Sequence, residues 1–212
     1  MQARNIDYNN PVGKPLFGIS FNNSWSSFTG SNLPQKYFYK PSLGSHLRCE
    51  YYIKPYLGFG IAAGIQQRGA GIKTPDLDQS LGNPDSTNRH RIRINTIDVP
   101  LYLIIKSPKD LFKGVKPSLQ IGINWNRNFK TTDIFYSVED GFHNRTNATN
   151  DYYRNAQPSL HAALGFDINA GTNLFQLQFI YNKGSNNVYN SVAFGNSVAK
   201  SSLFGVQLSI LY

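Results

Sequence analysis

The chain has 212 residues, with 21 Lys and Arg against 12 Asp and Glu, which gives a formal net charge of +9. Charged residues make up only 16%, below the quarter that is usual in a soluble domain. No run of about 18 apolar residues occurs, which excludes a transmembrane helix. The basic residues are scattered and no nucleic-acid-binding motif accompanies them, so we expect no nucleic-acid partner.

Eight segments alternate large apolar residues with small or polar ones, as a β-strand does when its two faces meet different surroundings. In chain order, strands are predicted over residues 16–28, 42–53, 57–68, 91–105, 116–127, 156–169, 174–183 and 204–212. The fourth segment is irregular, because Ile92 and Ile94 are out of phase with the apolar residues from Ile97 onward. This irregularity predicts a bulge near Asn95–Thr96.

The last segment alternates most clearly. Its apolar positions are Phe204, Val206, Leu208, Ile210 and Tyr212. Each of the eight segments is close to the 9–11 residues that a tilted strand needs to cross a bilayer. The pattern predicts a barrel whose apolar face meets lipid and whose polar face lines a narrow, wet interior.

The connections between the segments alternate in length. The long ones cover residues 29–41, 69–90, 128–155 and 184–201, and the others are short. Outer-membrane barrels combine short periplasmic turns with long extracellular loops in this way. We therefore predict an all-β fold, an eight-stranded antiparallel up-and-down transmembrane β-barrel over residues 16–212, with residues 1–15 as a periplasmic N-terminal tail.

Two further features bear on location. Aromatic residues fall near the loop ends of strands, as in an aromatic girdle: Trp25, Trp125, Tyr153 and Tyr181. Residues 1–15 contain no apolar stretch, so we expect that a signal peptide has been removed. A soluble lipocalin-like barrel also alternates, but its solvated face usually carries many Lys and Glu, whereas the polar face here is Gly, Ser, Gln and Asn. The cell outer membrane is the predicted location.

Several stretches support a family resemblance: the third strand ending in Gln66-Gln67-Arg68-Gly69, the stretch Ile97-Asp98-Val99-Pro100-Leu101, and the aromatic last residue Tyr212. With these the chain resembles the small outer-membrane barrel proteins of Bacteroidota, the group that includes PorT-like proteins. The resemblance implies that Phe204–Tyr212 is an assembly signal for the barrel assembly machinery. It implies no catalytic residue.

Four ionisable side chains are predicted to face inward near mid-height: His46, Arg48, Glu50 and Asp98. Buried charges need partners, and the lumen of an eight-stranded barrel is just filled by side chains. We therefore expect an ion-pair plug that stabilises a closed barrel, with a transport path as the alternative.

The sequence gives little support for a chemical site. The four histidines lack metal-ligand spacing, and Asp76, Asp78 and Ser80 match only part of a calcium loop. Ser159 and His161 share a face, but no third member of a hydrolase site is evident. We expect no cofactor, no metal and no enzymatic activity.

The loops 69–90 and 128–155 are too long for simple connections. They combine mixed charge with aromatic residues, and the candidate partner-binding side chains are Phe135, Tyr136, Phe142 and Tyr152. The densest basic cluster, Arg89, Arg91 and Arg93, lies at a loop-to-strand junction, where basic residues typically meet lipid phosphates.

The leading hypothesis is a non-catalytic subunit of a cell-envelope complex, for example in protein secretion, such as the type IX secretion that PorT-like relatives serve, or in nutrient uptake. Expected partners are outer-membrane lipid and lipopolysaccharide, the barrel assembly machinery and another envelope protein. A small gated pore and a soluble ligand-binding barrel are the alternatives.

Overall fold

The structure is a computed structural model that describes residues 11–31, 33, 36–73, 89–136, 143–146, 153–171, 173–188 and 198–212. The described residues form ten strands: β1 (Pro15–Ser31), β2 (Tyr37–Phe38), β3 (Lys40–Lys54), β4 (Leu57–Lys73), β5 (Arg89–Lys106), β6 (Val115–Tyr136), β7 (His143–Thr146), β8 (Ser159–Ala170), β9 (Asn173–Gly184) and β10 (Val198–Leu211). None of these residues belongs to a helix long and apolar enough to span a membrane.

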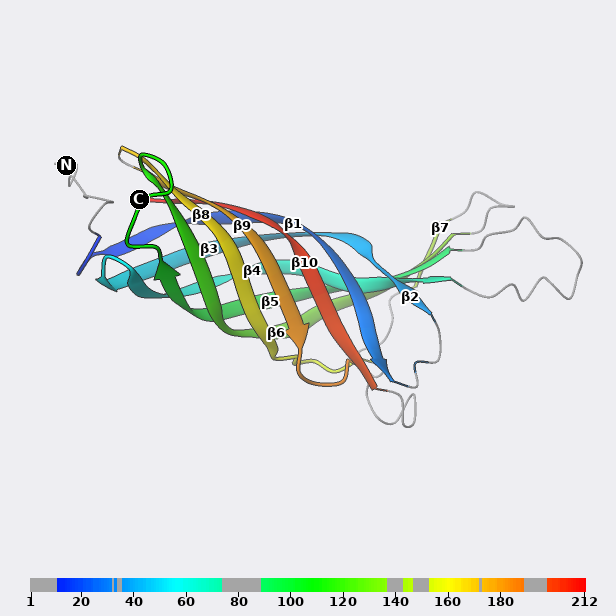
Figure 1. The fold of residues 1–212 in the computed structure, drawn as a ribbon. Coiled ribbons are helices and arrows are strands. Elements are labelled where there is room, and N and C mark those ends of the chain that lie inside the picture. The colour runs from blue at the N-terminus through cyan, green and yellow to red at the C-terminus, as the bar shows by residue number, and fades with distance from the viewer. Residues whose placement is uncertain are drawn as a thin grey trace, which may run out of the picture.

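Eight of the strands close into a barrel (Figure 1). Their order is β4-β3-β1-β10-β9-β8-β6-β5, and β5 pairs with β4 to complete the ring. All of these pairings are antiparallel, and β10 pairs with β1 from Gly18↔Leu211 to Ser31↔Val198. The prediction of an eight-stranded antiparallel up-and-down barrel is therefore confirmed.

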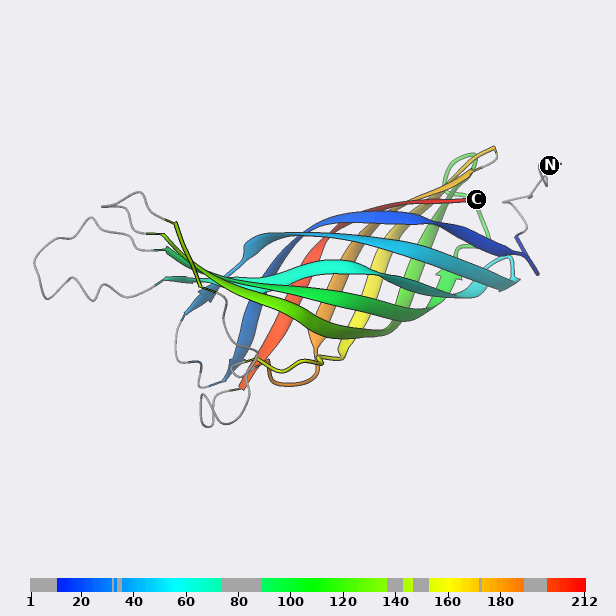
Figure 2. The same ribbon diagram turned by 180° about the vertical axis from the view of Figure 1, so that it is seen from behind.

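Both ends of the described chain lie at one end of the barrel, together with the turns that join β3 to β4, β5 to β6 and β8 to β9 (Figures 1 and 2). We call this the short-turn end and the opposite one the long-loop end. Of the predicted tail 1–15, residues 1–10 lie outside the described residues, and Pro15 already belongs to β1. Gly13 N donates to Tyr52 O at 3.0 Å, so the chain before β1 is held against the short-turn end.

The apolar face of the sheet points outward. Ile121 is 52% exposed, Leu208 59% and Phe166 39%, while their polar neighbours on the other parity are buried. A soluble barrel would have the apolar face inside, because exposing a continuous apolar surface of this size to water is energetically unfavourable. The outer face is thus the predicted lipid-facing one.

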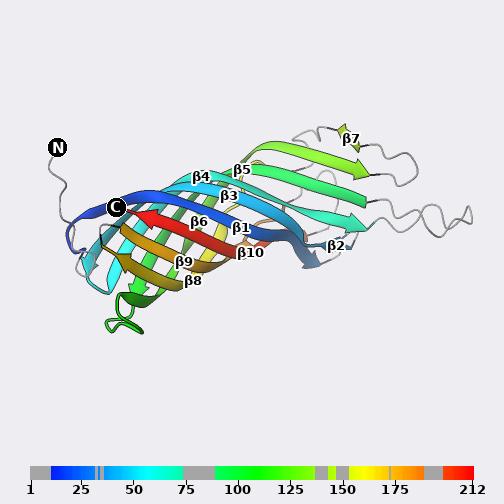
Figure 3. The same ribbon diagram turned by 90° about the horizontal axis from the view of Figure 1, so that it is seen from above.

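Most of the strands are longer than predicted; β10, for example, begins at Val198 instead of residue 204. β4, β5 and β6 run into the segments 69–90 and 128–155, which were expected to be loops, and β6 reaches 22 residues. They form, with β2 on the edge of β4 and β7 on the edge of β6, a sheet that continues past the long-loop end (Figure 3). We call this region, made of residues 69–73, 89–95 and 130–136 with β2 and β7, the sheet extension.

The register shift of β5 lies where the sequence predicts it, between Asn95 and Thr96, but the extra residue belongs to the partner strand β6. Asn95 pairs with Lys130 and Thr96 with Asn128, which leaves Phe129 unpaired. β5 itself alternates without interruption, so Ile92 and Ile94 point inward. The predicted bulge near Asn95–Thr96 is thus confirmed in position, but the change of phase comes from β6. Ile92 and Ile94 face inward because the interior at this height is apolar, which the local pattern does not reveal.

Candidate functional site

The candidate site consists of the barrel interior and the sheet extension. Alternation along β3 turns His46, Arg48 and Glu50 to the same inner face, and Asp98 on β5 also points inward. All four are buried. They do not form a single network, because Asp98 pairs with a different arginine.

Arg48 and Glu50 make the first ion pair, with 2.7 Å between Arg48 Nη2 and Glu50 Oε1. Two further donors reach the other carboxylate oxygen: Tyr52 Oη at 2.6 Å and Gln176 Nε2 at 3.2 Å. Arg48 Nε donates to Tyr102 Oη at 3.0 Å. A buried charge costs several kcal/mol unless it is paired and hydrogen-bonded, and this carboxylate meets both conditions.

Asp98 forms the second pair. Its Oδ2 lies 2.7 Å from Arg68 Nη2 and accepts from Asn124 Nδ2 at 2.8 Å, while Thr96 donates to Oδ1. A third pair joins Lys106 and Asp167, and Ser118 donates to Asp167 at 2.8 Å. The candidate set omits Arg68, Lys106 and Asp167. The alternation along each strand could have identified these three residues, because each occupies an inward-facing position of its strand.

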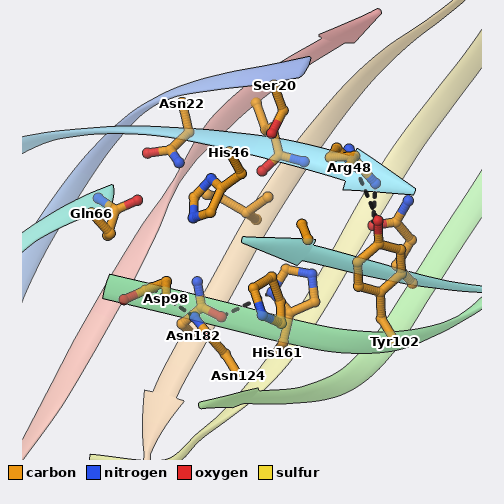
Figure 4. Close-up of a pocket in the computed structure, with 15 residues that line it drawn as sticks. Ser20, Asn22, His46, Arg48, Gln66, Asp98, Tyr102, Asn124, His161 and Asn182 are labelled. Carbon is orange, nitrogen blue, oxygen red and sulfur yellow. Dashed lines mark hydrogen bonds between the residues drawn. The ribbon is translucent and has the colours of Figure 1, made fainter. Parts of the chain in front are cut away.

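A small cavity of about 20 Å³ lies in the polar centre of the barrel, where Arg48 and Asp98 are among the residues that line it (Figure 4). His46 and His161 line it, and His161 Nδ1 is 2.9 Å from Asn182 Oδ1. This volume admits about one water molecule and no solute. Ser159 bonds to Asn126 and Asn124, so no described contact joins it to His161 as in a hydrolase pair. Within the described ranges, no three His, Cys, Asp or Glu side chains gather as a metal site.

Apolar layers lie on both sides of the polar centre. Toward the short-turn end the buried cluster contains Leu16, Tyr52, Ala62, Tyr102, Ile104, Leu174 and Leu211. Toward the long-loop end it contains Phe28, Ala70, Ile72, Ile92, Ile94, Tyr153, Val188 and Ala199. Side chains of the described residues therefore fill the interior at three levels, as expected for an eight-stranded barrel.

The outer surface carries most of the predicted girdle. Trp25, Trp125 and Tyr181 are exposed on the outer face. The Trp25 ring stacks on Phe204 with 5.7 Å between centroids, and Tyr39, which was not predicted, meets Phe204 edge-on at 5.0 Å. Tyr153 was assigned wrongly: it is 6% exposed and packs in the apolar cluster of the long-loop end. Its aromatic ring therefore fills the interior instead of facing the membrane boundary.

The predicted C-terminal segment lies in β10, with Phe204, Leu208 and Ile210 exposed on the outer face and Val206 half-buried. Tyr212 follows the strand, and its backbone exchanges hydrogen bonds of 2.8 and 2.9 Å with Phe17. The segment thus closes the barrel against β1, so the last strand completes the fold.

The four partner-binding candidates divide into two groups. The backbones of Phe135 and Tyr136 belong to β6 in the sheet extension, pairing with His90 and Arg89, so these residues are on a strand where a loop was expected. Phe142 and Tyr152, like Asp76, Asp78 and Ser80 of the partial calcium motif, lie outside the described residues.

The family model of the outer membrane protein beta-barrel domain matches residues 14–198. OprG from Pseudomonas aeruginosa is 14% identical, with 93% of this chain and 94% of OprG covered and a TM-score of 0.49. Neisserial surface protein A is 12% identical, with 92% of this chain and 96% of that protein covered and a TM-score of 0.45. Ail, the attachment invasion locus protein of Yersinia pestis, is also 12% identical, with 93% of this chain and 98% of Ail covered and a TM-score of 0.43. None of the curated protein sequences matches significantly.

Proposed function

Because this chain belongs to the family of the outer membrane protein beta-barrel domain, we propose that it serves as a non-catalytic interaction subunit of a cell-envelope complex. The barrel is an outer-membrane protein, and its apolar outer face is the surface that meets lipid. In this membrane the long-loop end is extracellular and the short-turn end periplasmic. Of the described residues, those of the sheet extension therefore lie farthest toward a partner outside the cell.

The observation that carries the proposal is the contrast between a filled interior and overlong strands. A tilted strand crosses the bilayer with about 9–11 residues. β8 and β9, with 12 residues each, hardly exceed that length, whereas β6 has 22. About ten residues of β6 thus serve a purpose other than crossing. A paired sheet that extends from a rigid barrel is suited to presenting a fixed surface to another protein.

The resemblance to PorT-like proteins supports protein secretion as the pathway, and nutrient uptake is the second candidate. In either case the extension would hold a soluble or membrane-bound envelope protein at the cell surface. The proposal includes β10 as the strand that the barrel assembly machinery reads during insertion.

The interaction can be tested with a photo-crosslinking residue in place of Tyr136 at the end of β6. We expect a discrete adduct of higher mass in intact cells, detected by immunoblotting and identified by mass spectrometry. The matched control carries the same residue in place of Phe112, which is 70% exposed at the short-turn end. Native protein that leaves the membrane in mild detergent only as a monomer, with no adduct from position 136, would overturn the proposal.

The closed interior leads to a second expected result. In planar lipid bilayers the purified protein should show no steady conductance above the background, because apolar layers block the lumen on both sides of the polar centre. A porin of known conductance in the same membrane is the control. Reproducible single-channel steps would favour a gated pore instead.

A further inference from the structure

A group of four cations lies on the outer face, across the junction between the barrel and the sheet extension. Arg91 and Arg93 lie on β5, and Arg127 and Lys130 on the neighbouring β6. The register pairs Asn95 with Lys130 and Ile97 with Arg127, so the four positions fall within a few rungs of one ladder. Alternate residues of a strand are about 7 Å apart and adjacent strands about 5 Å, so the four positions span about 20 Å along the ladder. A ligand with two separate phosphate groups can meet the long Arg and Lys side chains over this span. We call this group the cationic cluster.

The bulge in β6 determines which face Lys130 occupies. Before it, Trp125 and Arg127 point outward and Asn126 and Asn128 inward. A regular strand would therefore turn Lys130 inward, because its number is even. The unpaired Phe129 shifts the phase by one, so Phe129 and Lys130 are both exposed on the outer face. The bulge thus brings a fourth cation into the cluster.

No carboxylate balances this charge among the described side chains. The acidic residues whose side chains the structure describes are Glu50, Asp98 and Asp167, all in the interior, and Asp110 at the short-turn end. Arg91 and Arg93 also repel the buried Lys40 ammonium. Like charges gathered at this density raise the free energy of the folded state unless an external anion shares the site.

The surroundings of the cluster indicate which anion it meets. Exposed apolar side chains of the lipid-facing band lie among and below the cations on the same face: Phe129 between Arg127 and Lys130, Ile97 level with Arg127, and Trp125 below them. A ligand that contacts both regions needs acyl chains and an anionic head group attached to each other. A soluble anion would use only the cations.

We propose that the cationic cluster binds the phosphate groups of an anionic glycolipid in the outer leaflet, the lipid A part of lipopolysaccharide. Arg91, Arg93, Arg127 and Lys130 donate to the phosphate oxygens, and the acyl chains lie along Ile97, Trp125 and Phe129. Guanidinium groups suit this role because their fork of N–H donors matches phosphate geometry. The site also fits the position of the outer leaflet, at the extracellular limit of the apolar band.

The test uses the quadruple variant R91Q/R93Q/R127Q/K130Q in phosphocholine nanodiscs, with lipid A binding measured by native mass spectrometry. We expect the affinity for bisphosphorylated lipid A to fall at least roughly thirtyfold, because each cation near an anionic surface contributes a severalfold factor. The matched control removes four exposed cations at the short-turn end, K14Q/K54Q/K109Q/K113Q, and should bind as wild type does. If the quadruple variant does not fold, the R93Q/K130Q variant replaces it in the same measurement, and a smaller loss of affinity for lipid A is expected.

Two further arms identify the source of the phosphate. Wild-type protein should lose most of its affinity when lipid A is enzymatically dephosphorylated, and inorganic phosphate at the same concentration should not bind. The proposal is overturned if R91Q/R93Q/R127Q/K130Q binds lipid A as tightly as the control variant K14Q/K54Q/K109Q/K113Q does. It is also overturned if dephosphorylated lipid A binds wild-type protein as tightly as lipid A, or if inorganic phosphate or a soluble sulfated glycan binds as tightly as lipid A.

Discussion

Replacement of Glu50 by glutamine is expected to lower the free energy of unfolding by roughly 3–5 kcal/mol, the usual cost of breaking a buried ion pair. The Glu50 carboxylate is fully buried and bonded to Arg48, Tyr52 and Gln176. A neutral amide leaves the Arg48 guanidinium charged inside the barrel without its counter-ion. Urea unfolding in lipid vesicles, followed by tryptophan fluorescence, measures the change.

Two controls separate ion-pair loss from general disturbance. Asp110→Asn removes a charge from the exposed Asp110–Lys116 pair, whose atoms are 3.7 Å apart, and should change stability by less than about 0.5 kcal/mol. The double variant R48Q/E50Q should be more stable than E50Q alone, because no uncompensated charge remains. If E50Q and Asp110→Asn have the same small effect, the pair does not stabilise the barrel.

Replacement of Gly122 by alanine is expected to destabilise the barrel by about 3 kcal/mol or to prevent its closure. Gly122 on β6 pairs with Tyr102 on β5, whose large side chain fills the interior beside it. A Cβ atom at position 122 would lie 2.6 Å from the Tyr102 Cα and closer still to the Leu101 carbonyl oxygen. Both are backbone atoms of the adjacent strand, so no rotamer change relieves the clash.

Gly184→Ala is the matched control for this second variant. Its added methyl group would first meet the Ser201 hydroxyl at 2.8 Å, which can rotate away, and then the Ser201 backbone N and O at 3.1 and 3.2 Å. Because these backbone contacts are tight but do not overlap as those of Gly122 do, we expect a smaller loss, of about 1 kcal/mol. The fraction of folded protein after refolding into detergent, read from heat-modifiable gel mobility, compares the two. Equal refolding yields for G122A and G184A would show that the close approach of β5 and β6 does not require glycine.

The sequence pattern was sufficient for the parts of the fold that depend on strand period. Residues such as Ile121 and Leu208 share one parity with the other apolar residues of their strands, and the structure turns them outward. Arg48 and Glu50 follow from the same rule, because they share the opposite parity of β3. Parity is a local property, so a short window of sequence contains all the information required.

The alternation of strand faces could not predict which charged side chains pair in the interior. Asp98 was grouped with Arg48 because both face inward, yet its partner is Arg68. Which inward residues meet depends on the register and stagger between strands that are distant in the chain. The inward position of Tyr153 has a similar cause, since its segment lies between strands and its direction is set by the apolar cluster it joins.

The amino-acid sequence by itself determined that this chain forms an eight-stranded barrel with an apolar outside. The alternation of apolar with polar or small residues and the lengths of the connections are both local properties of the sequence. Only the tertiary structure decided how far β4, β5 and β6 extend, which charges pair in the interior, and that Lys130 joins three arginines on the outer face. Each of these depends on one strand meeting another: pairing prolongs the strands, register selects the ion pairs, and the unpaired Phe129 exists only relative to β5.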